Sequence, residues 1–318
     1  MASAVRTGRL NEPQLFRCRL NLGDLANCLS SMSCVVTQTT SGLIIGLLLF
    51  LVAAGVSLIF GVLKVVNFAH GSFYMLGAYF ALTGYQLSGN YFVAVLAGGV
   101  GVALFGLLFE RLLMSRVYGS PVLMQLLVCY GVILILDDVV KIVWGADFRS
   151  FGMPSTFQAL PIVFAGGVVP VFYLFLIVVA MAIAAVLGLV ITQTRYGKIV
   201  RAAAVNPSMV SALGINTGVV YASVFVIGGL LAGLAGGLAA PVRSLASGMG
   251  TSVIIESFIV TVIGGMGSVA GALVGSLLIG LVRSFGTIGF PLFTEGLMFL
   301  LMAVVLVVKP SGLFGKGN

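Results

Sequence analysis

Ionisable residues inside apolar sequence are the first candidates for chemistry in this chain. Asp137, Asp138 and Lys141 lie together near the end of one apolar stretch. Glu256 lies inside another. Because a charge at the bilayer centre costs about 2.5–3.5 kcal/mol on insertion scales, such residues mark a substrate or proton site or a locally paired charge. Asp137 and Lys141 are four residues apart on one helix face, so we expect them to form an ion pair. We expect Glu256 near the external surface, lining a vestibule or marking a helix start.

Motifs for covalent or nucleotide chemistry are missing from the sequence. A phosphate-binding loop needs Ser or Thr after Gly-Lys, and neither Gly197-Lys198 nor Gly315-Lys316 is followed by one. His70 is the only histidine, which excludes a two-histidine metal motif. The four cysteines have no C-x-x-C spacing, so we expect packing residues rather than a disulfide framework or a metal site: Cys18, Cys28, Cys34 and Cys129. We therefore predict no enzyme, no metal and no cofactor bound by this chain.

The composition identifies the elements that must carry these residues. Of the 318 residues, 60% are hydrophobic and 8% are charged, against about 25% charged in a soluble domain. The 43 glycines suit helices that pack closely in lipid. The net charge of +8 is distributed between apolar blocks, as positive-inside loops require, so we expect a lipid bilayer and no nucleic acid as partner. The sequence predicts an all-α polytopic membrane protein.

Charge-free intervals locate the spans. Asp, Glu, Lys and Arg are absent from 25–63, 65–109, 150–194 and 202–242, and a span needs about 20 apolar residues. We predict about eight to nine transmembrane segments, one of them broken by glycines at 264, 265 and 267: helices near 42–62, 71–88, 91–112, 121–143, 168–192, 217–240, 252–265, 268–284 and 290–308. The break at Gly264, Gly265 and Gly267 is either a re-entrant element beside a pathway or a site of close helix packing.

The basic loops predict the orientation. Residues 195–201 and the tail with Lys309 and Lys316 should be cytoplasmic, and 144–166 external, so the first span starts outside. The basic N-terminus conflicts with this placement. We expect residues 1–38 to be a disordered extension, and we hypothesise that Met32 is the natural start. Native peptides from before Met32 would contradict that hypothesis.

Two stretches of the sequence indicate more than a membrane protein of unspecified type. They are FGVLKVVNFAHGSFYMLGAY at 60–79 and RYGKIVRAAAVNPSMVSALGIN at 195–216. Together with GGMGS at 264–268 and PSGLFG at 310–315, they closely resemble the permease subunits of branched-chain amino acid ABC importers, the LivH-type half of the hydrophobic amino acid uptake family. The resemblance covers about residues 42–315 and implies an ABC importer permease domain over 39–315.

The resemblance also implies partners and a location. A second, LivM-type permease chain, two cytoplasmic ATPase subunits that hold ATP and magnesium, and a periplasmic substrate-binding protein would complete the assembly in a bacterial inner membrane. The implied substrate is a branched-chain or related amino acid. Relatives for urea, amides or aromatic acids are the alternative, because Asp137-Asp138 replaces the uncharged residues expected there. A stand-alone channel or carrier for a small polar solute is the rival from another class.

By the same resemblance, 195–216 is the coupling segment that docks on an ATPase. The segment is basic but has more apolar positions than an ordinary loop needs. Arg201, Asn206 and Gly214 are the expected docking and turn residues, and the full predicted coupling set is Arg195, Lys198, Arg201, Asn206, Met209 and Gly214.

The motif Asn67–Gly71 between the first two spans has two interpretations. Asn67, His70 and Gly71 lie along the translocation path, or the polar side chains satisfy backbone groups at a helix break. We favour the structural role slightly. Loss of transport in Asn67→Ala and His70→Ala with normal expression would favour the path.

Gly214 yields a direct test of the coupling segment. If its φ is positive, Gly214→Val strains the turn and should lower transport, because a β-branched residue disfavours that conformation. Wild-type coupling between ATP hydrolysis and transport in Gly214→Val would count against this.

Overall fold

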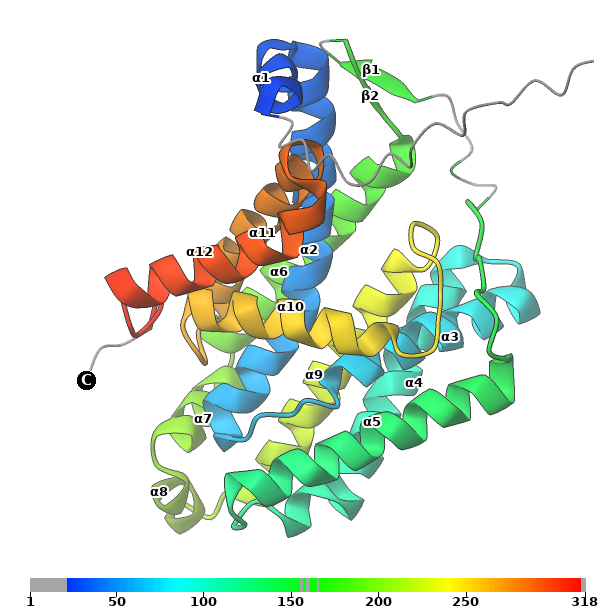
Figure 1. Cartoon of the computed structure of the whole chain (residues 1–318). Helices are drawn as coiled ribbons and strands as arrows, with labels where there is room; N and C mark the ends of the chain where they lie inside the picture. Colours follow the sequence, from blue (N-terminus) through cyan, green and yellow to red (C-terminus); the bar gives the residue numbers. More distant parts are fainter. Residues whose placement is uncertain (1–21, 155–156, 158–160, 165, 316–318) are drawn as a thin grey trace, which may run out of the picture.

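The chain folds into a bundle of helices with one small hairpin of strands (Figure 1). The computed structural model describes residues 22–154, 157, 161–164 and 166–315. The helices and strands are α1 (Leu22–Ser30), α2 (Met32–Leu63), α3 (His70–Ser88), α4 (Tyr91–Leu112), η1 (Met114–Arg116), α5 (Val122–Trp144), β1 (Ile162–Phe164), β2 (Gly167–Val169), α6 (Val171–Gln193), α7 (Arg195–Val205), α8 (Pro207–Ala212), α9 (Thr217–Ala239), α10 (Met249–Gly264), α11 (Val269–Gly289), η3 (Pro291–Phe293) and α12 (Thr294–Val308).

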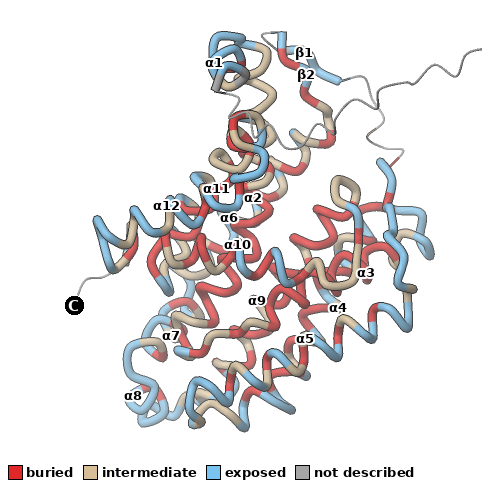
Figure 2. The backbone as a smooth tube through the Cα atoms, viewed as in Figure 1, coloured by how far each residue is buried: buried red, intermediate tan, exposed pale blue. Residues whose placement is uncertain are grey.

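Helix α2 is the centre of the bundle. Its residues 47–59 are all buried, on every side of the helix (Figure 2). It packs against α3, α6, α9, α10 and α11. A helix that is apolar all round, as this sequence is, has no face suited to water and is buried. In contrast, only a small share of the residues of α6 and α12 is buried within the chain, and their remaining apolar surface in a membrane faces lipid or another subunit.

The structure supports most of the predicted helices and corrects some of their bounds. Each of the nine predicted segments overlaps a helix. Among the described residues, six helices are long and apolar enough to cross a membrane: α2, α4 with η1, α6, α9, α11, and α12 with η3. The count of eight to nine spans therefore stays a prediction. Residues 168 and 169, expected in a helix, belong instead to an antiparallel hairpin in which Ile162 pairs with Val169, so the fold is not purely helical.

Helix α2 begins at Met32, ten residues before the predicted start. The prediction followed hydropathy, which rises only at Gly42, whereas the helix continues through the polar residues 37–41 because other elements pack on that end. The Ser33 hydroxyl donates a hydrogen bond of 2.8 Å to the carbonyl of Gly166 beside the hairpin. At 32 residues, α2 is about 48 Å long, more than the ~30 Å hydrocarbon core.

The N-terminal segment differs from the expectation of a disordered extension over 1–38. Residues 22–30 form α1, and 32–38 form the start of α2, while residues 1–21 lie outside the described residues. A disulfide between Cys28 and Cys34 joins α1 to the first turn of α2, with 5.2 Å between their Cα atoms. The prediction of packing cysteines was wrong for this pair, because six-residue spacing matches no disulfide or metal motif. Cys129 is a buried free thiol, as predicted.

The two ends of α2 carry different chemistry. The disulfide and the β1–β2 hairpin lie at its N-terminal end, and α7 packs near its C-terminal end (Figure 1). Arg195 and Lys198 are exposed on α7, and Lys64 directly follows α2. Positive charge gathered at the C-terminal end and a disulfide at the other agree with a cytoplasmic α7 and an external α1.

We predict that the Cys28–Cys34 disulfide forms on the outside of intact cells, because disulfides persist in the oxidising periplasm. After treatment with an impermeant reductant, a membrane-impermeant maleimide reagent should label both Cys28 and Cys34 in the full chain. Before reduction, the same reagent should label neither of them. The Cys28→Ser/Cys34→Ser variant keeps the other cysteines and should show no gain on reduction. Labelling that requires permeabilised cells would contradict the external placement of α1.

Candidate functional site

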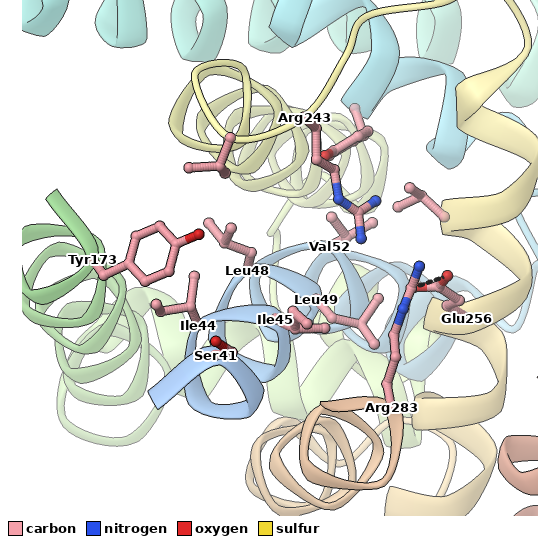
Figure 3. A pocket seen from close by; sticks show the side chains of 13 residues that line it. Ser41, Ile44, Ile45, Leu48, Leu49, Val52, Tyr173, Arg243, Glu256 and Arg283 are labelled. Atoms are coloured by element: carbon pink, nitrogen blue, oxygen red, sulfur yellow. Dashed lines mark hydrogen bonds and ion pairs between the residues drawn. The ribbon is translucent and has the colours of Figure 1, made fainter. Parts of the chain in front are cut away.

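A polar cavity lies against the middle of α2 (Figure 3). Its volume is about 290 Å³. Ser41 and Val52 bound the stretch of α2 that lines it, nine residues after the start of the helix and eleven before its end. The apolar wall is formed by side chains of that stretch: Ile44, Ile45, Leu48, Leu49 and Val52. The cavity therefore lies between the two ends of α2 and not at either one.

Three charged side chains face this wall. Arg243 follows α9, Glu256 lies on α10 and Arg283 on α11, and Figure 3 shows all three directed into the cavity. Arg283 donates a hydrogen bond from Nη1 to Oε1 of Glu256 and forms an ion pair with it. The side chains of Arg283 and Glu256 are 29% and 11% exposed. The phenol of Tyr74 lies beside Arg243. The three formal charges sum to +1.

The loop that carries Arg243 is held on both sides. Leu245 and Arg149 form an isolated antiparallel bridge, with two N–H···O bonds of 2.9 Å each, and Leu245 is buried. The carboxylate of Asp137 on α5 lies next to Gly248, directly before α10. These two contacts position both the arginine and the start of the helix that carries Glu256.

The predicted coupling segment forms two short helices with well-defined caps. The Thr194 hydroxyl accepts a hydrogen bond from Gly197 N at 3.1 Å and caps α7. The side chain of Asn206 accepts one from Met209 N at 3.0 Å and caps α8, whose first residue is Pro207. Both arrangements satisfy N–H groups that a helix leaves unpaired. Gly214 ends α8 with a φ of 82°, the positive value that the test of Gly214→Val requires.

Three apolar side chains of this segment are exposed. Val205, Met209 and Leu213 are 87%, 62% and 73% exposed. Val205 ends α7, and Met209 and Leu213 lie one turn apart at α8. Val210, in contrast, is buried and holds α8 to the bundle. We call Val205, Met209 and Leu213 the apolar ridge. Exposed apolar side chains gathered beside charged ones are typical of a surface that another protein covers.

Helix α7 is fastened to the bundle by polar contacts. Arg201 donates hydrogen bonds to the carbonyls of Ile191 and Thr192, at the C-terminal end of α6. The hydroxyls of Tyr196 and Ser223 lie 2.8 Å apart, which joins α7 to α9. Burial raises the pKa of Tyr196, so this phenol stays neutral. Arg195, Lys198 and Arg201 are all exposed. Among them, Arg201 has hydrogen-bond partners within the described part of this chain.

Comparison with known proteins identifies the family. The chain matches the family described as branched-chain amino acid transport system, permease component, over residues 38–308. The chain belongs to that family. This permease is 30% identical over 301 residues to the high-affinity branched-chain amino acid transport system permease protein LivH of Salmonella typhimurium, covering 88% of this chain and 95% of the relative.

Other relatives give the same result. The permease is 29% identical over 292 residues to the permease protein BraD of Pseudomonas aeruginosa, with 88% of this chain and 95% of BraD covered. It is 29% identical over 287 residues to a probable branched-chain amino acid transport permease protein LivH of Methanocaldococcus jannaschii, with 84% and 89% covered. No solved structure matches the chain. The permease is accordingly a multi-pass protein of the cell membrane and a transport protein, not an enzyme.

The predicted path residues of the first motif lie outside the cavity lining. Asn67 and His70 are buried in the bundle, and the Cys129 thiol donates a weak hydrogen bond of 3.7 Å to Oδ1 of Asn67. The His70 ring packs so closely on α2 that a Cβ added to Gly55 would lie 2.6 Å from its Nε2 atom. Gly71 meets Gly250 backbone to backbone, where the N-terminal ends of α3 and α10 touch. This placement agrees with the structural role favoured above, although their part in transport stays a prediction.

At the glycine break, the helices pack closely against each other. Gly264 and Gly271 touch through their backbones, which draws α10 and α11 into a hairpin. Gly265 and Gly267 have φ values of 97° and 88°, and their backbones lie against Gly312 and Gly61 respectively. None of the three predicted gate glycines is among the cavity residues. The break therefore shapes the hairpin that presents Glu256 and Arg283.

The structure corrects one prediction about charged residues. Lys141 pairs with Asp138 at 2.9 Å, one helical turn away, rather than with Asp137, which faces Gly248 instead. Glu256 lines the cavity and pairs with Arg283 on the neighbouring helix. Its place near the external surface stays a prediction.

Arg243 and Arg283 are the charged cavity residues that the sequence did not predict. Each directly follows a long apolar interval, so both resemble the loop charges that set topology. The position of Arg283 was a sign that it is not a loop charge, because it falls inside the predicted helix 268–284 rather than beside it. A charge inside a span requires a partner, and Glu256 lies inside the preceding span.

We predict that Glu256→Gln destabilises the permease, because it leaves the Arg283 guanidinium without its counter-charge. An unpaired partner of this kind costs about 1–3 kcal/mol. Thermal unfolding of the purified permease in detergent should show a lower midpoint for Glu256→Gln, and adding Arg283→Met should recover part of the loss. Glu295→Gln, at an exposed acid of α12, is the matched control and should leave the midpoint unchanged. Equal midpoints for the two single variants would contradict the role of the ion pair.

Proposed function

We propose that this permease is a transmembrane subunit of an ATP-driven ABC importer for branched-chain or related amino acids. It forms half of the translocation pathway together with a second, LivM-type permease chain. Two cytoplasmic ATPase subunits hold ATP and magnesium, and a periplasmic substrate-binding protein delivers the solute. Family membership and the names of the relatives support the transport of branched-chain amino acids.

The apolar ridge is the observation that carries the proposed coupling to ATPases. Val205, Met209 and Leu213 stay exposed on a segment whose basic residues favour the cytoplasm. A soluble cytoplasmic partner with an apolar groove would cover them, as amphipathic helices are commonly recognised. Within the described residues, no segment of this chain covers the ridge itself.

The attachment of α7 supports a mechanical route to the cavity. Thr194 alone separates α6 from α7, and Arg201 binds the last carbonyls of α6. When ATP binding draws the ATPases together, a docked α8 displaces α7 and α6 as one unit. The other end of α6 carries Tyr173, which lines the cavity. Displacement of the ridge thus changes the shape of the cavity and opens it to one side at a time.

Uptake into vesicles tests the proposed function. Proteoliposomes with both permease chains, both ATPases and the binding protein should accumulate L-leucine only with ATP. The same permease chains without ATPases should accumulate none, because this chain has no nucleotide-binding loop. Solute movement by this chain alone would establish the rival channel or carrier. ATP-dependent uptake of urea or amides in place of leucine would establish the alternative substrate class.

We predict that Met209→Asp uncouples the transporter, because a charge at the centre of the apolar ridge must lose water on docking. ATP-dependent leucine uptake should fall at least tenfold, and ATPase subunits should dissociate from the permease during purification. Ser208→Asp places the same charge one residue away, at an exposed position outside the ridge, and should keep uptake within about twofold of wild type. Equal uptake by the two variants would contradict docking through the ridge.

A further inference from the structure

We propose that the cavity beside α2 is a binding site for the amino acid in transit, in which Arg243 binds the α-carboxylate. Glu256 accepts a hydrogen bond from the ammonium group, and the apolar wall of α2 contacts the side chain of the solute. This inference rests on the proposed function and names what that function leaves open: which residues of the membrane domain recognise the solute, and by which of its groups.

The charges in the cavity define the complementary ligand. Glu256 is the only acid among the lining residues, and its Oε1 is already bound to Arg283. The neighbour of Arg243 in the cavity is the phenol of Tyr74 rather than a carboxylate. Arg243 is half-buried, and a charge removed from water is costly without an opposite charge. A carboxylate from the solute supplies that charge, and the fork of the guanidinium fits its two oxygens.

The second carboxylate oxygen of Glu256 can bind the ammonium group of a zwitterionic solute. The bond to Arg283 uses one carboxylate oxygen of Glu256, which leaves Oε2 as an acceptor for an ammonium group. Glu256 and Arg243 come from different elements and both face the same cavity (Figure 3). A solute with a carboxylate and an ammonium on one carbon satisfies both, so the site selects α-amino acids over neutral amides and over amines.

The opposite wall fits an apolar side chain. Ile44, Leu48 and Val52 lie on one face of α2, at four-residue spacing, and all three line the cavity. The volume of about 290 Å³ is just below the roughly 300–1,000 Å³ found for drug-sized ligands, as a smaller solute requires. Polar groups at one side and branched aliphatic groups at the other match an aliphatic amino acid.

Photo-crosslinking and uptake test this assignment in the assembled transporter. Photo-leucine, a diazirine analogue of leucine, should label the peptide that contains residues 41–52 during ATP-driven turnover. Arg243→Met should remove that labelling and lower leucine uptake at least about tenfold, since a charge-assisted hydrogen bond of this kind is worth a factor of ten or more. Arg243→Lys keeps the charge and should retain more of both. Arg116→Met, at an exposed arginine outside the cavity, is the matched control and should match wild type.

The outcomes separate the two proposals. If the unsubstituted complex takes up leucine with ATP but Arg243→Met takes it up equally well, the inference is wrong and the proposed function stands. Labelling confined to peptides that do not line the cavity also overturns the inference, whether or not the variants fold. If the unsubstituted complex takes up no leucine, the proposed function fails, and this inference fails with it.

Discussion

Close contact between helix backbones is the constraint on which this structure depends. Lipid gives apolar side chains no reason to leave it for one another, so helices in a membrane associate by packing tightly and by satisfying their polar groups. Helix α2 meets α11 where Gly46 faces the backbone of Ser276, and α4 meets α9 where Gly233 faces Gly98. A side chain at any of these positions would separate the helices. The bundle that surrounds α2, and with it the cavity, follows from these contacts.

The sequence predicted the elements well because the bilayer tolerates few charges. Intervals without Asp, Glu, Lys or Arg marked several of the helices, and Gly214 was expected to form the turn at the end of 195–216. The capping roles of Thr194 and Asn206 became visible only in the structure. The ends outside the apolar core were less predictable. Met32 begins α2 because α1 and the hairpin pack on its polar first turns, and a tertiary contact of this kind leaves no periodic signal in the chain.

The site could be predicted only in part, for a similar reason. Asn67 and His70 are conspicuous by residue type, yet the fold places them in the packed interior. Arg243 and Arg283 resemble loop charges by position, yet the hairpin of α10 and α11 and the bridge at Leu245 direct them into one cavity. Residue type predicts which groups are expensive to bury. Which of them face each other depends on how α2, α10 and α11 cross, and spacing along the chain does not contain that information.

Helix α6 connects the cavity to the α7–α8 segment. Its 23 residues extend about 34 Å between the two. Much of its apolar surface is not buried within this chain, so lipid or another subunit must cover it. At its C-terminal end, Arg201 binds its last carbonyls and joins it to α7. At its N-terminal end, the buried ring of Phe172 packs on Tyr91 and Phe157, next to Tyr173 in the cavity lining. The helix is thus attached at both ends, one at the cavity and one at the α7–α8 segment, and the proposed coupling requires that connection.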